Sequence, residues 1–176
     1  MDEKDFPTVY RGRVHVLGDG IDTDQIMPGK YLTILDPKVL ATHCLEGWDP
    51  EWASKKVGPG DVLVAGHNFG CGSSRESAPV SIKAAGISCV IAESFARIFF
   101  RNAINIALPV MVCPGVAAAF EAGHELEVDI DSGVVKNLTA GKTLRAEALP
   151  SNIQHILKSG GLVEVTRRKL EARAAA

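Results

Sequence analysis

Residues 61–113 decide the fold class: DVLVAGHNFGCGSSRESAPVSIKAAGISCVIAESFARIFFRNAINIALPVMVC. Short apolar runs predict three strands, at 61–65, 87–92 and 109–113. The segments that follow them predict three helices, at 77–85, 94–106 and 116–123. Strand–helix alternation of this kind indicates a parallel or mixed sheet with helices packed against it.

The ends of two of these helices carry capping signals. Ser94 precedes the second helix and is a plausible N-cap, because its hydroxyl can accept a hydrogen bond from an unpaired amide of the first turn. Gly123 follows the third helix, in the position where a left-handed residue commonly ends a helix.

Upstream of this core, residues 14–17 form a short apolar run that ends at a Gly-Asp-Gly turn and predict a strand. Residues 21–37 lack helical periodicity and are rich in turn formers, so we expect a long ordered loop. Asp36 and Pro37 have the pattern of a cap followed by proline at the first helical position, which predicts a helix over 37–45.

Downstream of the core, the pattern changes. Residues 125–138 alternate with period two around Asp131-Ser132-Gly133 and predict a hairpin. Further strands are expected at 141–150 and 161–165, separated by a helix at 151–158. We therefore expect an α/β fold, a mixed sheet flanked by helices with an appended antiparallel portion, in a single domain over 1–176, with a core at about 12–165, a tail at 166–176 and fraying at 172–176.

Composition excludes several functional classes. A net charge of −2 over 176 residues offers no electrostatic footprint for nucleic acid. The chain has no signal-like apolar segment and no run long enough to span a bilayer. Its four cysteines are widely spaced, so we expect reduced thiols, a cytoplasmic protein and no metal site of its own.

The strongest chemical signal is the glycine loop, residues 66–76, at the junction of a predicted strand and a predicted helix. Gly70 and Gly72 allow the backbone to approach a ligand closely. Ser73 and Ser74 add hydroxyl groups, and Arg75 adds a planar guanidinium that matches a carboxylate or phosphate. At a helix N-terminus these groups suit an anion. A tight turn whose serines merely cap the helix is the structural alternative.

Known anion-loop motifs do not match this stretch. No lysine follows the glycines as in a P-loop, the dinucleotide fingerprint lacks its third glycine, and the G-x-S-x-G elbow of hydrolases is absent. Cys71 is a further candidate nucleophile, although its sequence context favours an unreactive buried cysteine. A stand-alone anion-binding module and a Cys71-dependent enzyme therefore stay open.

Three motifs, in order along the chain, resemble one family. They are GDGIDTDQIMPGKYL at 18–32, NFGCGSSRE at 68–76 and AGISCVIAESFARIFFRNAINIALPV at 85–110. They resemble the swivel domain of the aconitase family and, more closely, the small subunits of 3-isopropylmalate dehydratase. The resemblance covers residues 12–165. Many members carry histidine where this chain has Ser77.

This resemblance implies one half of a hydro-lyase. In that family a separate large subunit holds a [4Fe–4S] cluster, and the swivel subunit closes over it. The resemblance gives Ser73 the role of the base and gives Ser74 and Arg75 contacts to a carboxylate of a small dicarboxylate substrate. Asp22, Thr23 and Asp24 are expected to support the site, although an ordinary turn explains them equally well from sequence.

The resemblance implies that the substrate side chain is selected by the loop that contains Tyr31, Leu32 and Thr33. The structural alternative is that the apolar residues of this loop belong to the core or to an interface. No positive charge lies between Lys30 and Lys38, so this loop favours an alkyl group over a further carboxylate. The predicted reaction is conversion of 2-isopropylmalate to 3-isopropylmalate by loss and re-addition of water, a step of leucine biosynthesis. Dimethylmalate and citramalate are alternative substrates.

Overall fold

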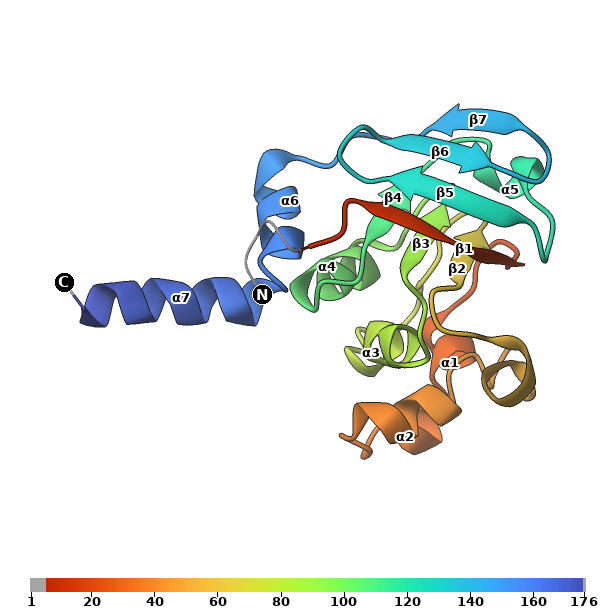
Figure 1. Cartoon of the computed structure of the whole chain (residues 1–176). Coiled ribbons are helices and arrows are strands. Elements are labelled where there is room, and N and C mark those ends of the chain that lie inside the picture. The colour runs from red at the N-terminus through yellow and green to blue at the C-terminus, as the bar shows by residue number, and fades with distance from the viewer. Residues whose placement is uncertain (1–5, 176) are drawn as a thin grey trace.

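The computed structural model describes residues 6–175, and its strands form a seven-stranded sheet in the order β4-β3-β2-β1-β5-β6-β7 (Figure 1). The first four strands pair in parallel, and β1, β5, β6 and β7 pair antiparallel. The predicted mixed sheet with an appended antiparallel portion is confirmed. The strands are β1 (Val9–Val16), β2 (Val62–Ala65), β3 (Cys89–Ala92), β4 (Val110–Val112), β5 (Glu125–Asp129), β6 (Val134–Asn137) and β7 (Lys142–Arg145).

Helices flank the parallel half of the sheet. In Figure 1, α1, α2 and α3 lie together on the side away from β5–β7, whereas α7 extends away from the rest of the chain. The helices are α1 (Thr23–Ile26), α2 (Pro37–Thr42), α3 (Ser77–Ala84), α4 (Arg97–Asn105), α5 (Val116–Ala119), α6 (Ser151–Lys158) and α7 (Leu162–Ala174). A 3₁₀ turn (Gly29–Tyr31) and a π-helical turn (Trp52–Lys56) lie within the long connections.

Burial explains why the central strands are apolar along their whole length. All four residues of β2 and all four of β3 are buried, because helices cover the parallel sheet on its faces. Because β2, β3 and β4 are parallel, their carboxyl ends lie at the same end of the sheet, and the glycine loop begins there. Binding sites in sheets of this type commonly lie at that edge.

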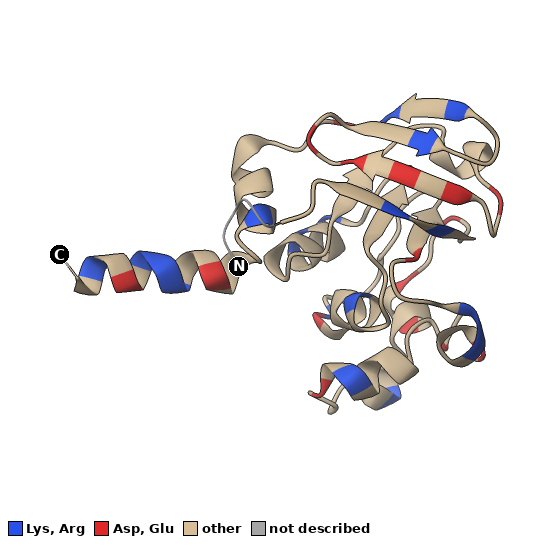
Figure 2. Cartoon of the chain, viewed as in Figure 1, with Lys and Arg blue, Asp and Glu red and all other residues tan. Residues whose placement is uncertain are grey.

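The antiparallel portion has a charged outer surface. Arg11 on β1 pairs with Glu125 on β5 at 2.8 Å, and Lys136 on β6 pairs with Glu127 on β5 at 2.8 Å. Figure 2 shows the acidic stretch of β5 lying between basic positions of its two neighbours. Cross-strand pairs of opposite charge favour this strand order and register.

The predicted hairpin is confirmed by β5 and β6, which Gly133 joins with a positive φ of 71°. The helix expected at 151–158 is also confirmed, as α6. The loop expected at 21–37 is ordered but contains α1 and the 3₁₀ turn, which are too short to produce a helical periodicity.

Ser94 is not the N-cap of α4, and that prediction was wrong. The cap residue is Ala96, because residues 94–96 stay extended and Phe95 forms an isolated bridge with Phe69. The Ser94 hydroxyl instead accepts a hydrogen bond from the amide of Asn68, at 2.9 Å. This serine therefore anchors the start of the glycine loop.

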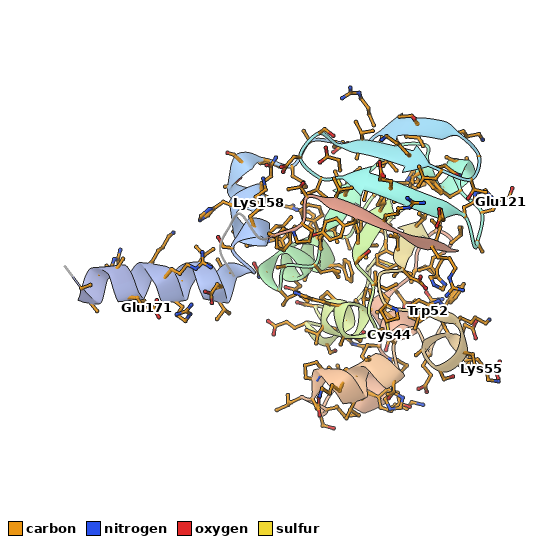
Figure 3. All side chains as sticks on the ribbon, in the orientation of Figure 1. Cys44, Trp52, Lys55, Glu121, Lys158 and Glu171 are labelled. Carbon is orange, nitrogen blue, oxygen red and sulfur yellow. The ribbon has the colours of Figure 1, made fainter. Side chains whose placement is uncertain are left out.

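The strand predicted at 161–165 was wrong as well, because these residues open α7. A mostly apolar run of only five residues fits either structure, and Glu164 has arginines three and four residues later that pair with it along a helix. The tail expected at 166–176 is helical to Ala174, whereas Ala176 lies outside the described residues. The start of α7 packs against α4 and α6, where Val165 is buried, whereas Figure 3 shows the rest of the helix extending away from the dense packing around the sheet.

The four cysteines carry free thiols, as predicted. Burial raises the pKa of the Cys44 and Cys89 thiols to about 12 and that of Cys113 to about 11, so these three are unreactive near neutral pH. Among the described residues no helix is long and apolar enough to cross a membrane.

Candidate active site

The glycine loop leaves the carboxyl end of β2 and is held by the segment 18–24 along its length. Gly20 donates a backbone hydrogen bond to His67, Gly70 donates to Ile21, and Thr23 donates to Cys71, each at 2.8 Å. Two segments about 50 residues apart in sequence therefore form one rigid unit. This explains why the sequence places its chemistry in both of them.

Two glycines of the loop have positive φ, and each meets a different neighbour. At Gly70, φ is 76° and a Cβ atom would lie 2.2–2.5 Å from Phe99. At Gly72, φ is 89° and a Cβ would lie 3.3 Å from the Thr23 hydroxyl. Side chains are excluded by backbone conformation at both positions and by space at Gly70. The tight curve they create presents Ser73, Ser74 and Arg75 together.

Arg75 is held by α1 through one nitrogen of its guanidinium. Nη1 donates to a carboxylate oxygen of Asp24 at 2.5 Å and to the carbonyl of Met27 at 3.0 Å. The arginine side chain is only 12% exposed, whereas that of Asp24 is 63% exposed. The buried guanidinium is thus oriented from one side. Among the described residues no hydrogen bond uses its Nε or Nη2, so these donors are available to an anion.

Asp24 is expected to act as a positioning residue for Arg75, which an Asp24→Asn variant tests. Because the carboxylate is mostly exposed, its pairing contributes about 0.5–1 kcal/mol. The KM for the substrate should rise about two- to fivefold, with kcat and the melting temperature almost unchanged. Asp24→Glu should restore much of the affinity. A fall in melting temperature with no change in KM would show a structural role only.

The three residues of the cluster at 22–24 make different contacts. Asp22 caps α1: its carboxylate accepts from the Gln25 amide at 2.7 Å, and the Gln25 side chain accepts from the Asp22 amide at 3.0 Å. Thr23 is 2% exposed and donates its amide to the glycine loop. Only Asp24 touches Arg75 with its side chain. The turn interpretation fits Asp22, whereas a supporting role at the site stays a prediction, carried by the contact of Asp24 with Arg75.

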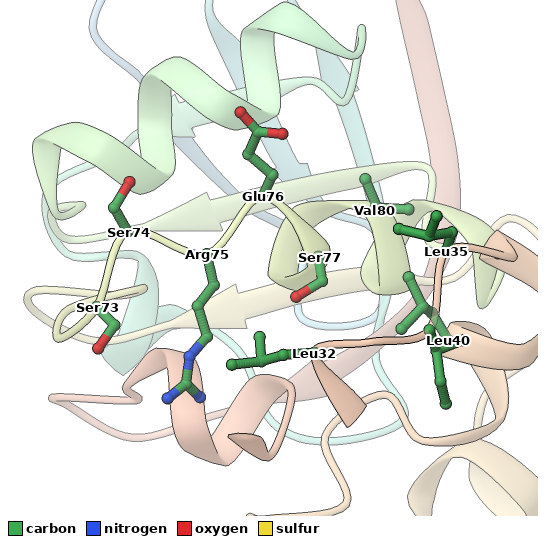
Figure 4. Close-up of a pocket in the computed structure, with 10 residues that line it drawn as sticks. Leu32, Leu35, Leu40, Ser73, Ser74, Arg75, Glu76, Ser77 and Val80 are labelled. Carbon is green, nitrogen blue, oxygen red and sulfur yellow. The ribbon is translucent and has the colours of Figure 1, made fainter. Parts of the chain in front are cut away.

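A cavity of about 640 Å³ lies over the glycine loop (Figure 4). One side is polar, and the other is apolar. In Figure 4, the Ser73 hydroxyl and the Arg75 guanidinium point to the same side of the loop, whereas the Ser74 hydroxyl and the Glu76 carboxylate point away from the guanidinium. The lining residues are Leu32, Ile34, Leu35, Leu40, Ser73, Ser74, Arg75, Glu76, Ser77 and Val80.

Two residues expected to bind substrate lie outside this lining. Tyr31 stacks on His43 with ring centroids 3.8 Å apart, and its hydroxyl donates to Glu46 at 2.9 Å. Thr33 is exposed and does not line the cavity either. The Tyr31 contacts anchor the loop, and Leu32 then reaches the cavity. The substrate-binding roles of Tyr31 and Thr33 stay predictions.

The sequence reasoning missed the part of the wall that comes from two helices. Leu40 from α2 and Val80 from α3 line the cavity together with the loop leucines. Their positions look like ordinary core positions in the sequence, since each lies on the inner face of a predicted helix. One pattern in the sequence could have placed Val80 in the cavity wall: Ser77 and Val80 are three residues apart and therefore share a face of the predicted helix.

The described residues of this chain do not fit a metal ion or an iron–sulfur cluster. Within residues 6–175 no group of three or more His, Cys, Asp and Glu side chains is close enough to hold a metal ion. Cys71, the cysteine of the loop, points its sulfur toward the carbonyl of Gly20 at 3.6 Å and has no histidine beside it. No step described below passes through a metal on this chain.

Comparison with known proteins identifies the family. The model of the aconitase C-terminal domain matches residues 50–113. The chain is 59% identical to the 3-isopropylmalate dehydratase small subunit 1 of Methanopyrus kandleri, over 92% of this chain and 94% of that protein. The chain belongs to the 3-isopropylmalate dehydratase small-subunit family. The resemblance found in the three sequence motifs is confirmed.

Other members of this family bear different substrate names. The 2,3-dimethylmalate dehydratase small subunit of Eubacterium barkeri is 54% identical, over 87% of this chain and 93% of that protein. The isopropylmalate/citramalate isomerase small subunit of Methanocaldococcus jannaschii is 50% identical, over 93% and 96%. A crystal structure of 3-isopropylmalate dehydratase from Methanocaldococcus jannaschii superposes with a TM-score of 0.88 at 44% identity, over 96% of this chain and 99% of that one.

Proposed function

We propose that this chain is the small subunit of a heteromeric hydro-lyase that interconverts 2-isopropylmalate and 3-isopropylmalate in leucine biosynthesis. One observation carries the proposal: the cavity over the glycine loop combines Ser73 and Arg75 with an apolar wall. A malate with an alkyl substituent has the matching chemistry, since its carboxylates suit the guanidinium and its alkyl group suits the leucines. The names of the relatives support the same substrate class.

In this proposal Ser73 removes and returns the proton on the substrate carbon. Ser73, in its deprotonated alkoxide form, accepts the C–H proton and becomes a hydroxyl as the carbon–carbon double bond forms. The neighbouring hydroxyl group takes up a proton from a group outside this chain and leaves as water. Returning the proton to the other carbon, with water added beside it, gives the isomer. Arg75 holds a carboxylate, which orients the C–H bond toward Ser73. Ser74 receives its carboxylate contact from the family resemblance alone, since its hydroxyl points away from the guanidinium in the free chain.

Departure of the hydroxyl needs help that this chain does not supply. We propose that a large subunit carrying a [4Fe–4S] cluster closes over the cavity and provides it, in keeping with the small-subunit names of the relatives. The active form is then a complex of the two chains, working in the cytoplasm on a small dicarboxylate, with no part for nucleic acid or membrane.

Substrate selection is expected to depend on Leu32, which is half exposed and lines the cavity. In a Leu32→Ala variant, kcat/KM for 2-isopropylmalate should fall about tenfold relative to that for citramalate, because a change of one or two methylenes in an apolar pocket is worth about 1–3 kcal/mol. Val39→Ala is the matched control, since Val39 is exposed on α2 outside the cavity. An unchanged ratio would remove Leu32 from the specificity wall.

The deciding experiment is an anaerobic assay of this chain mixed with a cluster-loaded large subunit, on 2-isopropylmalate, dimethylmalate and citramalate. Turnover that needs both chains supports the proposal, and the preferred substrate separates the alkyl-malates. A stand-alone anion-binding module predicts the opposite result: no turnover in any mixture, with tight binding of phosphate or dicarboxylate by the isolated chain.

A further inference from the structure

Three polar side-chain atoms are buried without a hydrogen-bond partner among the described residues: Thr23 Oγ1, Ser77 Oγ and Asn102 Nδ2. Leaving a buried polar group unpaired is costly, so each one calls for an explanation. Thr23 lines none of the cavities described for this chain, and Asn102 lines a separate small one. Ser77 alone shares the cavity of Ser73 and Arg75.

Ser77 is the first residue of α3, and Glu76, the cap residue, makes no side-chain hydrogen bond to the helix. In the first turn the amide of Ala78 donates to the carbonyl of Arg75 at 3.3 Å, and Pro79 has no amide hydrogen. The N-terminal end of the helix dipole still favours negative charge at this position. The Ser77 hydroxyl therefore lies where the helix dipole also stabilises an anion.

The Ser77 oxygen points toward the space between Arg75 and Leu32 in Figure 4. Arg75 uses Nη1 to bind Asp24 and Met27, and within residues 6–175 its Nε and Nη2 have no hydrogen-bond partner. Leu32 is half exposed on its loop, so its side chain has room to change rotamer and admit a ligand to the hydroxyl. Ser77 and Arg75 thus provide donors to the same part of the cavity.

We propose that the Ser77 hydroxyl donates a hydrogen bond to a carboxylate of the bound alkyl-malate, beside Arg75. This inference rests on the proposed function and adds a substrate contact to it. The Ser77 hydroxyl has no partner among the described residues of the free chain, and the substrate carboxylate accepts its hydrogen bond in the complex. Ser77 contributes to binding and leaves proton transfer to Ser73.

The test compares Ser77→Ala with the unmodified chain in the cluster-loaded complex, at saturating large subunit. The KM for 2-isopropylmalate should rise at least about tenfold with kcat nearly unchanged, as for loss of a hydrogen bond to a charged group. The melting temperature of the free chain should stay the same or rise, because the substitution removes an unpaired buried hydroxyl. Ser77→Thr, which keeps a hydroxyl, should restore most of the affinity.

Ser81→Ala is the matched control on the same helix. The Ser81 hydroxyl is buried like that of Ser77 but donates to the carbonyl of Ala78 at 2.8 Å. This variant should melt at a lower temperature and keep its KM. The opposite responses of two serines one turn apart separate a ligand contact from a structural one.

Several outcomes would overturn the inference. An unchanged KM in an active Ser77→Ala complex does so, and so does a raised KM accompanied by a lower melting temperature. Weaker assembly with the large subunit at an unchanged saturated KM would instead assign the hydroxyl to the partner. Absence of turnover by the unmodified complex would overturn the proposed function itself, and the substrate contact with it.

Discussion

A Ser73→Ala complex is expected to lose about 10²–10⁴-fold in kcat while its KM for 2-isopropylmalate changes little. Loss of a positioned acid–base group has this magnitude, and the substitution leaves the carboxylate contacts of Arg75 in place. The side chain is exposed over the cavity and makes no hydrogen bond within the described residues, so its removal should not disturb the fold. Steady-state kinetics with a cluster-loaded large subunit measures the effect.

Ser54→Ala is a suitable control, because Ser54 is an exposed serine on the π-helical turn and does not line the cavity. Titrating each variant with large subunit shows that both assemble equally well. Full activity of an assembled Ser73→Ala complex would remove Ser73 from the reaction and leave the loop as a binding element alone.

The second large effect is expected from Gly70→Ala, which should destabilise the chain strongly. A Cβ at this position would lie 2.2–2.5 Å from Phe99, a side chain that is itself buried. Overpacking of this kind costs about 1–3 kcal/mol, and a non-glycine residue at positive φ adds about 1–3 kcal/mol more. The free energy of unfolding, measured in denaturant, should fall by about 2–6 kcal/mol.

Gly123→Ala separates the two contributions. Gly123 also has a positive φ, of 89°, but nothing lies within 4 Å of the Cβ that would be added. This variant should lose only the backbone contribution, about 1–3 kcal/mol. Equal losses in both variants would mean that Phe99 moves aside without cost, and that Gly70 is required for its backbone conformation alone.

The local pattern of the sequence predicted most of the sheet and the place of the glycine loop between a strand and a helix. The strands β2, β3 and β4 and the helix α3 follow from apolar runs and turn residues that are close neighbours in sequence. The hairpin around Gly133 follows from the positive φ that its turn requires. These elements are predictable because short-range sterics and hydrogen bonding select them.

Short local patterns failed where tertiary contacts decided the conformation. Residues 161–165 are mostly apolar and valine-rich, as in many strands, yet they open a helix that charged side chains of the next turn stabilise. Ser94 is a residue type that often caps helices, yet its hydroxyl accepts a hydrogen bond from the amide of Asn68 in another loop. Both signals span only a few residues, so a single long-range contact outweighs them.

For the site, the sequence alone predicted that a loop of glycines, hydroxyls and Arg75, with the chemistry to bind an anion, lies at the end of a buried strand. Only the tertiary structure decided that Asp24, 51 residues away, orients Arg75, that Val80 and Leu40 complete the apolar wall, and that Ser77 has an unpaired hydroxyl inside the same cavity. The reason is physical: residue type sets what a side chain is able to bind, whereas the packing of distant segments sets which donors are already satisfied and which remain free for a ligand.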